Sequence, residues 1–504
     1  MIRYSAPSYG TQIKESKMFR LLSIWMVTWT FVSSQYLSSE AQMRPLTFAM
    51  RKLAFSTNQF GIDLYRALKV PKNEGVAFCP FCISTSLAMI LLGAQGRSAN
   101  ALQQALYLWG VRQEDVHIAF HDLLIHLRDN LQVTPGHHIA DHTNNNGGFR
   151  QEYGVQDFEI LLFNSIYVQR EYSILYHYQK FLHSFYNTSV HPLDFSMYGE
   201  ESRLHINAIV EKQTKGNIKN ILSQSLPKTT SVLLLNALSF DGILDTTGST
   251  VSPPQEDIHR HSQFNQFSPS GYNNHHSFSL NHAFQPTHSR LPPMGGPASY
   301  YAPSFAQAIP YAAASPYNSH NFITPPTRTR QGGLRHGTYD YLGCTAVEIP
   351  FRSGMLSLVL LIPTDTSSIN MLETRLNAQH ITDILSTMQA KNVILEMPHI
   401  SFEDSPKNLT QALFRSGLVD LFTPGFAELL GMSDFRWLHI TNLIHKINVN
   451  IKNGNGINHQ SPAPASGQET LHMNIQEKPF LFFVIDNISG LALVMGKMAA
   501  NRRL

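Results

Sequence analysis

Two cysteines lie three positions apart in the first part of this chain. Cys79 and Cys82 form a Cys-x-x-Cys pair directly before an apolar run, Ile83 to Leu92, that is typical of a buried helix. A helix N-terminus lowers the pKa of a thiol, and redox enzymes activate such pairs in this way. However, no strand–helix–strand pattern leads into the pair. With Cys344, the chain has three cysteines, which do not make a disulfide scaffold or a metal site with ligand-like spacing.

Histidine is frequent in this chain, with 24 in 504 residues, and its side chain can bind metals and titrate. Seven of these histidines lie within residues 245–327. This stretch also holds twelve prolines and only five charged residues, a composition that supports neither a periodic helix nor a long strand. We interpret residues 245–327 as a low-complexity disordered insert. Its histidines, including His275 and His276, could bind a metal or respond to pH. Their irregular spacing favours a solvated linker, so we expect no metal site and no cofactor.

The rest of the chain has the patterns of a folded protein. Apolar residues make up 43% of the chain and charged residues 14%, against about 25% charged in typical globular chains. The formal net charge of +3 gives no reason to expect a nucleic-acid partner. Helical patterns occur at 53–68, 83–92, 116–131 and 204–214, and strand-like runs at 158–168, 232–240, 345–350, 355–363, 393–398, 480–485 and 491–495. We therefore expect one domain of mixed fold, formed by residues 42–244 and 328–504.

The N-terminus has the layout of a signal peptide. A mildly basic lead precedes an apolar run from Leu21 to Val32, and small residues follow. This run falls short of the roughly 20 residues that span a bilayer, and a signal anchor is the alternative. We assign residues 1–41 to the lead and signal peptide and expect no membrane span after its removal. Sequons at Asn187, Asn408 and Asn487 are candidate glycosylation sites, so we expect a secreted, extracellular protein.

Several motifs are spread in order from Leu53 to Lys497. They include a buried helical start at 78–83 (FCPFCI), a glycine-rich exit at 92–96, a helix at 206–218, and a C-terminal run at 478–483 (KPFLFF). Together they resemble the serpin family of serine protease inhibitors. The resemblance implies an α+β fold in which N-terminal helices pack on a large central mixed β-sheet, with two smaller sheets. It also implies a protein without catalytic residues.

Serpins present an exposed loop as bait to a serine protease. After cleavage, the first half of the loop inserts as a new central strand and distorts the acylated enzyme. The resemblance places this loop at residues 453–477, with a hinge formed by Asn453, Gly454, Asn455 and Gly456. Pro462 and Pro464 follow, and proline cannot donate to a β-ladder. At about 1 kcal/mol for each lost bond and about 1–3 kcal/mol for each unpaired buried partner, these prolines oppose insertion by several kcal/mol.

Family spacing places the scissile region at Gln468, Glu469 and Thr470. No Lys or Arg lies within residues 453–477, so the loop gives no support for a trypsin-like target.

The family has a serine pair at the positions of Cys79 and Cys82, facing the region where the sheet opens. This explains the spacing of the cysteines without redox chemistry. The resemblance also places Asn236 and His445 in a polar network there, with His445 as a core residue. Free cysteine packs like a small hydrophobe and forms only weak hydrogen bonds, so we expect the network to be weakened.

For this one fold, the sequence leaves two functions open. The first is a secreted, monomeric serpin-family protein that has impaired or lost protease trapping and acts by binding an extracellular protein or ligand. The second is a working inhibitor of an extracellular serine protease. A minor alternative is thiol–disulfide exchange through Cys79 and Cys82, which requires an exposed Cys79.

Overall fold

The computed structural model describes residues 47–131, 134–135, 157–244, 329–365, 368–453 and 471–500. Most of the described α-helices lie in the first half of the chain: α2 (Phe48–Leu68), α3 (Pro80–Leu91), α4 (Gly96–Ala105), α5 (Gln113–Leu131), α6 (Tyr176–Tyr186) and α7 (Gly199–Gln213). The other described α-helices are α8 (Ser368–Arg375), α9 (Ala378–Thr387) and α10 (Leu409–Leu413). The helix starts have local causes. Thr47 caps α2 by accepting a hydrogen bond from the Met50 amide, and Pro80 occupies the first turn of α3, where its missing N–H costs nothing.

One of the two sheets in the described residues has six strands. Its order is β10–β11–β5–β3–β2, and β4 also pairs with β3. The strands are β2 (Thr134–Pro135), β3 (Phe158–Gln169), β4 (Val190–Leu193), β5 (Val232–Leu244), β10 (Ile400–Asp404) and β11 (Ile440–Asn453). The strands β3, β5 and β11 are the longest of the described strands, and the sheet is mixed because β5 pairs with β11 in parallel and with β3 in the antiparallel direction.

The other sheet has eight strands in the order β1–β14–β13–β8–β7–β6–β9–β12. They are β1 (Val76–Phe78), β6 (Thr329–Tyr339), β7 (Cys344–Pro350), β8 (Leu356–Pro363), β9 (Gln389–Glu396), β12 (Leu471–Asn474), β13 (Phe480–Asp486) and β14 (Ala492–Met498). The two smaller sheets that we expected are continuous here, because β6 pairs with both β7 and β9.

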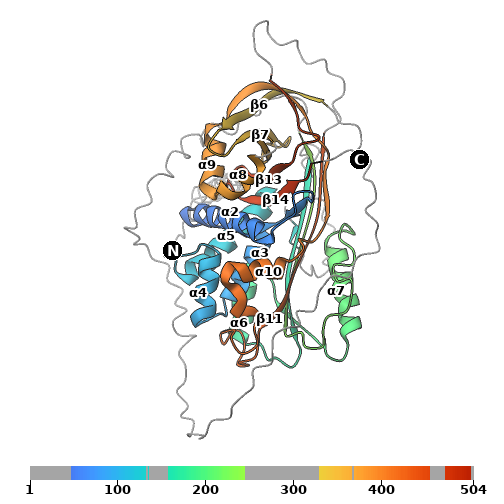
Figure 1. Ribbon diagram of the computed structural model, residues 1–504. Coiled ribbons are helices and arrows are strands. Elements are labelled where there is room, and N and C mark those ends of the chain that lie inside the picture. The colour runs from blue at the N-terminus through green and yellow to red at the C-terminus, as the bar shows by residue number, and fades with distance from the viewer. Residues whose placement is uncertain are drawn as a thin grey trace, which may run out of the picture. The chain divides into compact units, whose positions relative to one another are not determined.

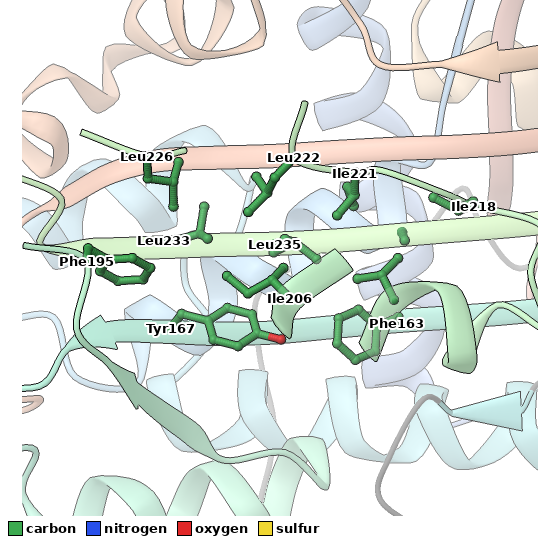
Figure 2. Close-up of a cluster of buried hydrophobic side chains, with 12 residues drawn as sticks. Phe163, Tyr167, Phe195, Ile206, Ile218, Ile221, Leu222, Leu226, Leu233 and Leu235 are labelled. Atoms are coloured by element: carbon green, nitrogen blue, oxygen red, sulfur yellow. The ribbon is translucent and has the colours of Figure 1, made fainter. Parts of the chain in front are cut away.

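The six-stranded sheet is covered on both faces (Figure 1). On one face it contacts α3, whose twelve residues are all buried. On the other face α7 packs against β3. Figure 2 shows the core of this second layer, where Ile206 of α7 lies among Phe163 and Tyr167 of β3 and Leu233 and Leu235 of β5. Each face of β5 therefore meets a different helix.

The expected helices and strands agree with the structure to within a few residues at their ends. The largest differences are at helix starts, because α2 and α7 begin five residues before the apolar periodicity does, at Phe48 and Gly199. Among the described residues, no helix combines the length and apolar character that a membrane span requires.

Candidate functional site

The strands β5 and β11 are direct neighbours in the six-stranded sheet, and we call the boundary between them the seam. They pair in parallel from Val232 with Ile440 to Leu244 with Asn453, which uses the whole of β5. The register is continuous from Asn442 onward. Because side chains alternate along a strand, odd-numbered and even-numbered residues of β5 point to opposite faces of the sheet. The seam is therefore held by a backbone ladder and by side chains on two faces.

On the face that contacts α3, the seam is bridged by a buried chain of hydrogen bonds, which we call the α3 bracket. The amide N–H of Cys79 donates to Nε2 of His445 on β11, at 3.0 Å. Nδ1 of His445 donates to Oδ1 of Asn236, its register partner on β5. Nδ2 of Asn236 then donates to Oγ of Ser86 in α3, at 3.1 Å. All four residues are buried.

The α3 bracket fixes the protonation state of His445. Nε2 accepts a hydrogen bond from a backbone N–H, which cannot act as an acceptor, so only Nδ1 carries a proton and the ring is neutral. Burial lowers the pKa of His445 to about 3. The ring is therefore a structural bridge across the seam and keeps this role at any pH at which the protein is folded and the ring stays neutral.

Cys79 and Cys82 are joined by a disulfide, contrary to our expectation of free thiols. Cys79 has an extended backbone immediately before α3 and Cys82 lies in its first turn, which brings the two Cα atoms to 5.3 Å. The bridge leaves the N–H of Cys79 free to bond His445, so the α3 bracket forms through the backbone of Cys79 rather than through a cysteine side chain. Both cysteines are fully buried, which does not favour thiol–disulfide exchange with a substrate.

On the opposite face, the segment after α7 crosses the seam. Nδ2 of Asn217 donates to Oγ of Ser239 on β5, at 3.0 Å. The carbonyl of Asn217 accepts from Nδ2 of Asn448 on β11, at 2.8 Å. Ser239 and Asn448 are register partners, so one residue holds directly opposed positions of the two strands. We call this arrangement the Asn217 clamp.

Local sequence places Asn217 over the seam. Gly216 has a φ of +82°, a left-handed conformation that favours glycine and turns the chain at the end of α7. Oγ1 of Thr214 accepts from the amide of Ile218, at 3.1 Å, and Ile218 is buried in the core of this layer. A further bond joins Nζ of Lys446 on β11 to the carbonyl of Lys219, at 3.0 Å.

Similar proteins identify this architecture. A family model described as serpin (serine protease inhibitor) matches residues 55–250 and 325–500. The chain belongs to the serpin family. Serpin B3 of Homo sapiens is 23% identical over 470 residues, which cover 90% of this chain and 100% of the relative. The leukocyte elastase inhibitor of Xenopus tropicalis is 25% identical over 462 residues, with the same coverage. A crystal structure of maspin has a TM-score of 0.64 at 20% identity, covering 90% of this chain and 100% of maspin.

The predicted sites of this serpin fall into two groups. Asn236, His445, Cys79 and Cys82 meet at the α3 bracket. From the reactive loop, the backbone of Asn453 lies at the end of β11. The other hinge and scissile positions lie outside the described residues: Gly454, Asn455, Gly456, Gln468, Glu469 and Thr470.

The three sequons differ in their surroundings. Asn187 and Asn408 are exposed. Asn487 is partly buried, and its Nδ2 donates to the carbonyl of Gly354, at 2.8 Å. Ser489 of the same sequon is buried and hydrogen-bonded to Asp486.

Sequence reasoning missed Ser86, Ser239 and Asn448, and it gave no role to Asn217, although this residue lies in the family-like run at 206–218. A polar residue within a buried helix or a covered strand has no periodic signal that would mark its partner. Among the described residues, no group of three or more His, Cys, Asp or Glu could hold a metal ion. The geometry of the site is that of a closed joint between two strands.

Proposed function

We propose that this serpin does not trap proteases and acts by binding through its folded, uncleaved form. The observation that supports this most is that Pro462 and Pro464 lie in the part of the loop that would have to become a central strand, where they would leave gaps in the new ladder. The loop would enter between β5 and β11, which pair continuously and are bridged by the α3 bracket and the Asn217 clamp. Any serpin that inserts its loop must separate these two strands, so the prolines are the feature that opposes trapping in this chain.

The test is one protease cut within residues 457–473, followed by measurement of Tm. We expect no rise, because the cut loop stays outside the sheet. We also expect serine proteases of elastase-like and chymotrypsin-like specificity to cleave the loop without forming a complex that survives denaturing electrophoresis. The same cut is made in the double variant Pro462→Ala with Pro464→Ala, which removes both prolines from the loop. A large rise in Tm or a stable complex with the unaltered chain would overturn the proposal.

A second candidate function is inhibition of a serine protease, with the loop as bait. It is favoured by the name of one relative, the leukocyte elastase inhibitor. It predicts a stable complex with an elastase-like enzyme in the assay above. If the chain is an inhibitor, its partner is an extracellular serine protease. If it acts by binding alone, its partner is another extracellular protein or ligand. Neither reading gives the chain a catalytic centre.

We also propose that the protein is secreted. The signal-peptide pattern within residues 1–41 supports this, and so does the Cys79–Cys82 disulfide, because disulfides persist in oxidising compartments. Expression in secretory cells should then give glycans on Asn187 and Asn408, which are exposed, and none on Asn487. Glycopeptide mass spectrometry with Asn187→Gln and Asn408→Gln as controls tests this. A protein retained inside the cells and free of glycans would count against secretion.

A further inference from the structure

The Cys79–Cys82 disulfide is built into the α3 bracket rather than lying beside it. Cys79 supplies the N–H that bonds His445 on β11. Cys82 lies in α3 one turn before Ser86, which bonds Asn236 on β5. The disulfide therefore joins the residue that holds one strand of the seam to the helix that holds the other.

We propose that this disulfide is a redox lock on the seam. In the oxidised state it fixes Cys79 against the first turn of α3, so both ends of the α3 bracket move as one body. In the reduced state Cys79 is tied to α3 only by backbone bonds, and its N–H loses its fixed position against His445. The closed seam is then less stable. The idea rests on the proposed function in one respect: the seam is the place where a cleaved loop would have to enter.

Burial couples the lock to the opening of the seam. Both cysteines are fully buried, beneath the strands that they help to hold. A reducing thiol can reach a sulfur atom only after a local opening around α3, and we take the separation of β5 from β11 to be that opening. Such sub-global openings occur without complete unfolding. By linkage, whatever favours opening must favour reduction, and reduction must favour opening to the same degree.

The chemistry needs an external thiol and balances with two electrons. The thiolate attacks one sulfur of the bridge, forms a mixed disulfide and releases the other cysteine as a thiolate, which takes up a proton. A second thiol attacks the mixed disulfide and releases the remaining cysteine. Cys79 and Cys82 end as two thiols, and the two external thiols end as one disulfide. Dithiothreitol supplies both thiols in one molecule.

The stability effect follows from the size of the loop. The bridge closes a short loop, for which the chain-entropy model gives a modest stabilisation. For a folded domain of this length, that stabilisation corresponds to a fall of about 2 °C in Tm on reduction. The variant Cys79→Ser with Cys82→Ser should show the same fall, and its Tm should not respond to dithiothreitol. Cys344→Ala, which removes the buried free cysteine in β7, is the matched control and should keep the redox response.

The decisive experiment measures how fast dithiothreitol reduces the folded protein. Samples are quenched with an alkylating reagent and the label on Cys79 and Cys82 is followed by mass spectrometry, while tryptophan fluorescence gives the rate of global unfolding. We expect reduction about 100-fold slower than in the denatured chain and about 10-fold faster than global unfolding. Asn217→Ala, on the opposite face of the seam, should accelerate reduction about 3-fold or more. Asn370→Ala, an exposed change in α8, should not.

Two results would overturn the lock. One is reduction that follows global unfolding in every variant, which would separate the disulfide from the seam. The other is a reduced protein with an unchanged Tm. Neither result bears on protease trapping, which is tested by the change in Tm after loop cleavage, so the two proposals can fail separately.

Discussion

The two faces of the seam are closed by different chemistry. The α3 bracket is fully buried, contains a titratable ring and is attached to a disulfide. The Asn217 clamp is partly exposed and uses only amides and a hydroxyl. Both bridge register partners on the same two strands, three residues apart.

This difference indicates which face of the seam responds to pH and to external thiols. Burial makes each hydrogen bond of the α3 bracket costly to lose, because the freed partner finds no water. Protons and thiols can act on the α3 bracket, since it contains the ring of His445 and the Cys79–Cys82 disulfide, whereas the Asn217 clamp contains neither kind of group. The Asn217 clamp should respond to neither, and water can replace its bonds when they break.

The largest effect is expected from His445→Ala. The change leaves a cavity in a buried layer and removes the partners of the Cys79 N–H and of Oδ1 of Asn236. Together these losses should lower the free energy of unfolding by about 3–5 kcal/mol in urea denaturation. His439→Ala, a less buried change just before β11, is the control and should cost less than about 1 kcal/mol. A loss below about 1 kcal/mol for His445→Ala would mean that the bracket does not hold the seam.

The second prediction concerns pH. Burial lowers the pKa of His445 and of His117 to about 3, below the unfolded value near 6.5. The unfolded chain therefore binds more protons below pH 6.5, and stability is full above that value and falls as the pH drops below it. Between pH 7 and pH 5 each histidine should cost about 2 kcal/mol.

The matched variant for this prediction is His445→Asn, which cannot titrate and should remove about half of this loss. Asn217→Ala should keep all of it, because the Asn217 clamp holds no titratable group at the seam. An equal pH dependence in His445→Asn and the parent would show that the ring does not stay neutral in the folded protein.

The third prediction addresses the Asn217 clamp. Asn217→Ala removes the bond to Ser239 but leaves the backbone carbonyl that receives Asn448, so the cost should be about 1 kcal/mol. Asn448→Ala breaks the other half and should cost a similar amount. The same denaturation experiments measure both. A cost as large as that of His445→Ala would remove the distinction between a buried and a partly exposed face.

Much of the fold could be predicted from the sequence because it depends on local pattern. Strands such as β5 and β13 are apolar at most positions on both faces, which is the pattern of a strand buried on both sides. Asn236 and His445 were found through motifs in family order. Their pairing then follows from the parallel register of β5 and β11, which one sequence does not specify.

The bonds that close the seam could not be predicted in the same way. The Cys79–Cys82 bridge is formed where the extended backbone of Cys79 turns into the first turn of α3, and the Cys-x-x-Cys spacing by itself does not tell a disulfide from two free thiols. Asn217 and Asn448 are 231 positions apart and have no pattern that joins them. Only the placement of the segment after α7 across both strands brings them together.

The smallest effect is the coupling between the two faces. Ser86→Ala leaves Nδ2 of Asn236 without its acceptor and should cost about 1–3 kcal/mol alone, and Asn217→Ala about 1 kcal/mol. The sheet lies between the two sites and they share no partner, so a double-mutant cycle should give a coupling energy below about 0.5 kcal/mol. Additive costs are compatible with an opening that breaks both faces, because each face then contributes its own share to the free energy of opening. A larger coupling would mean that the loss of one face already weakens the bonds of the other.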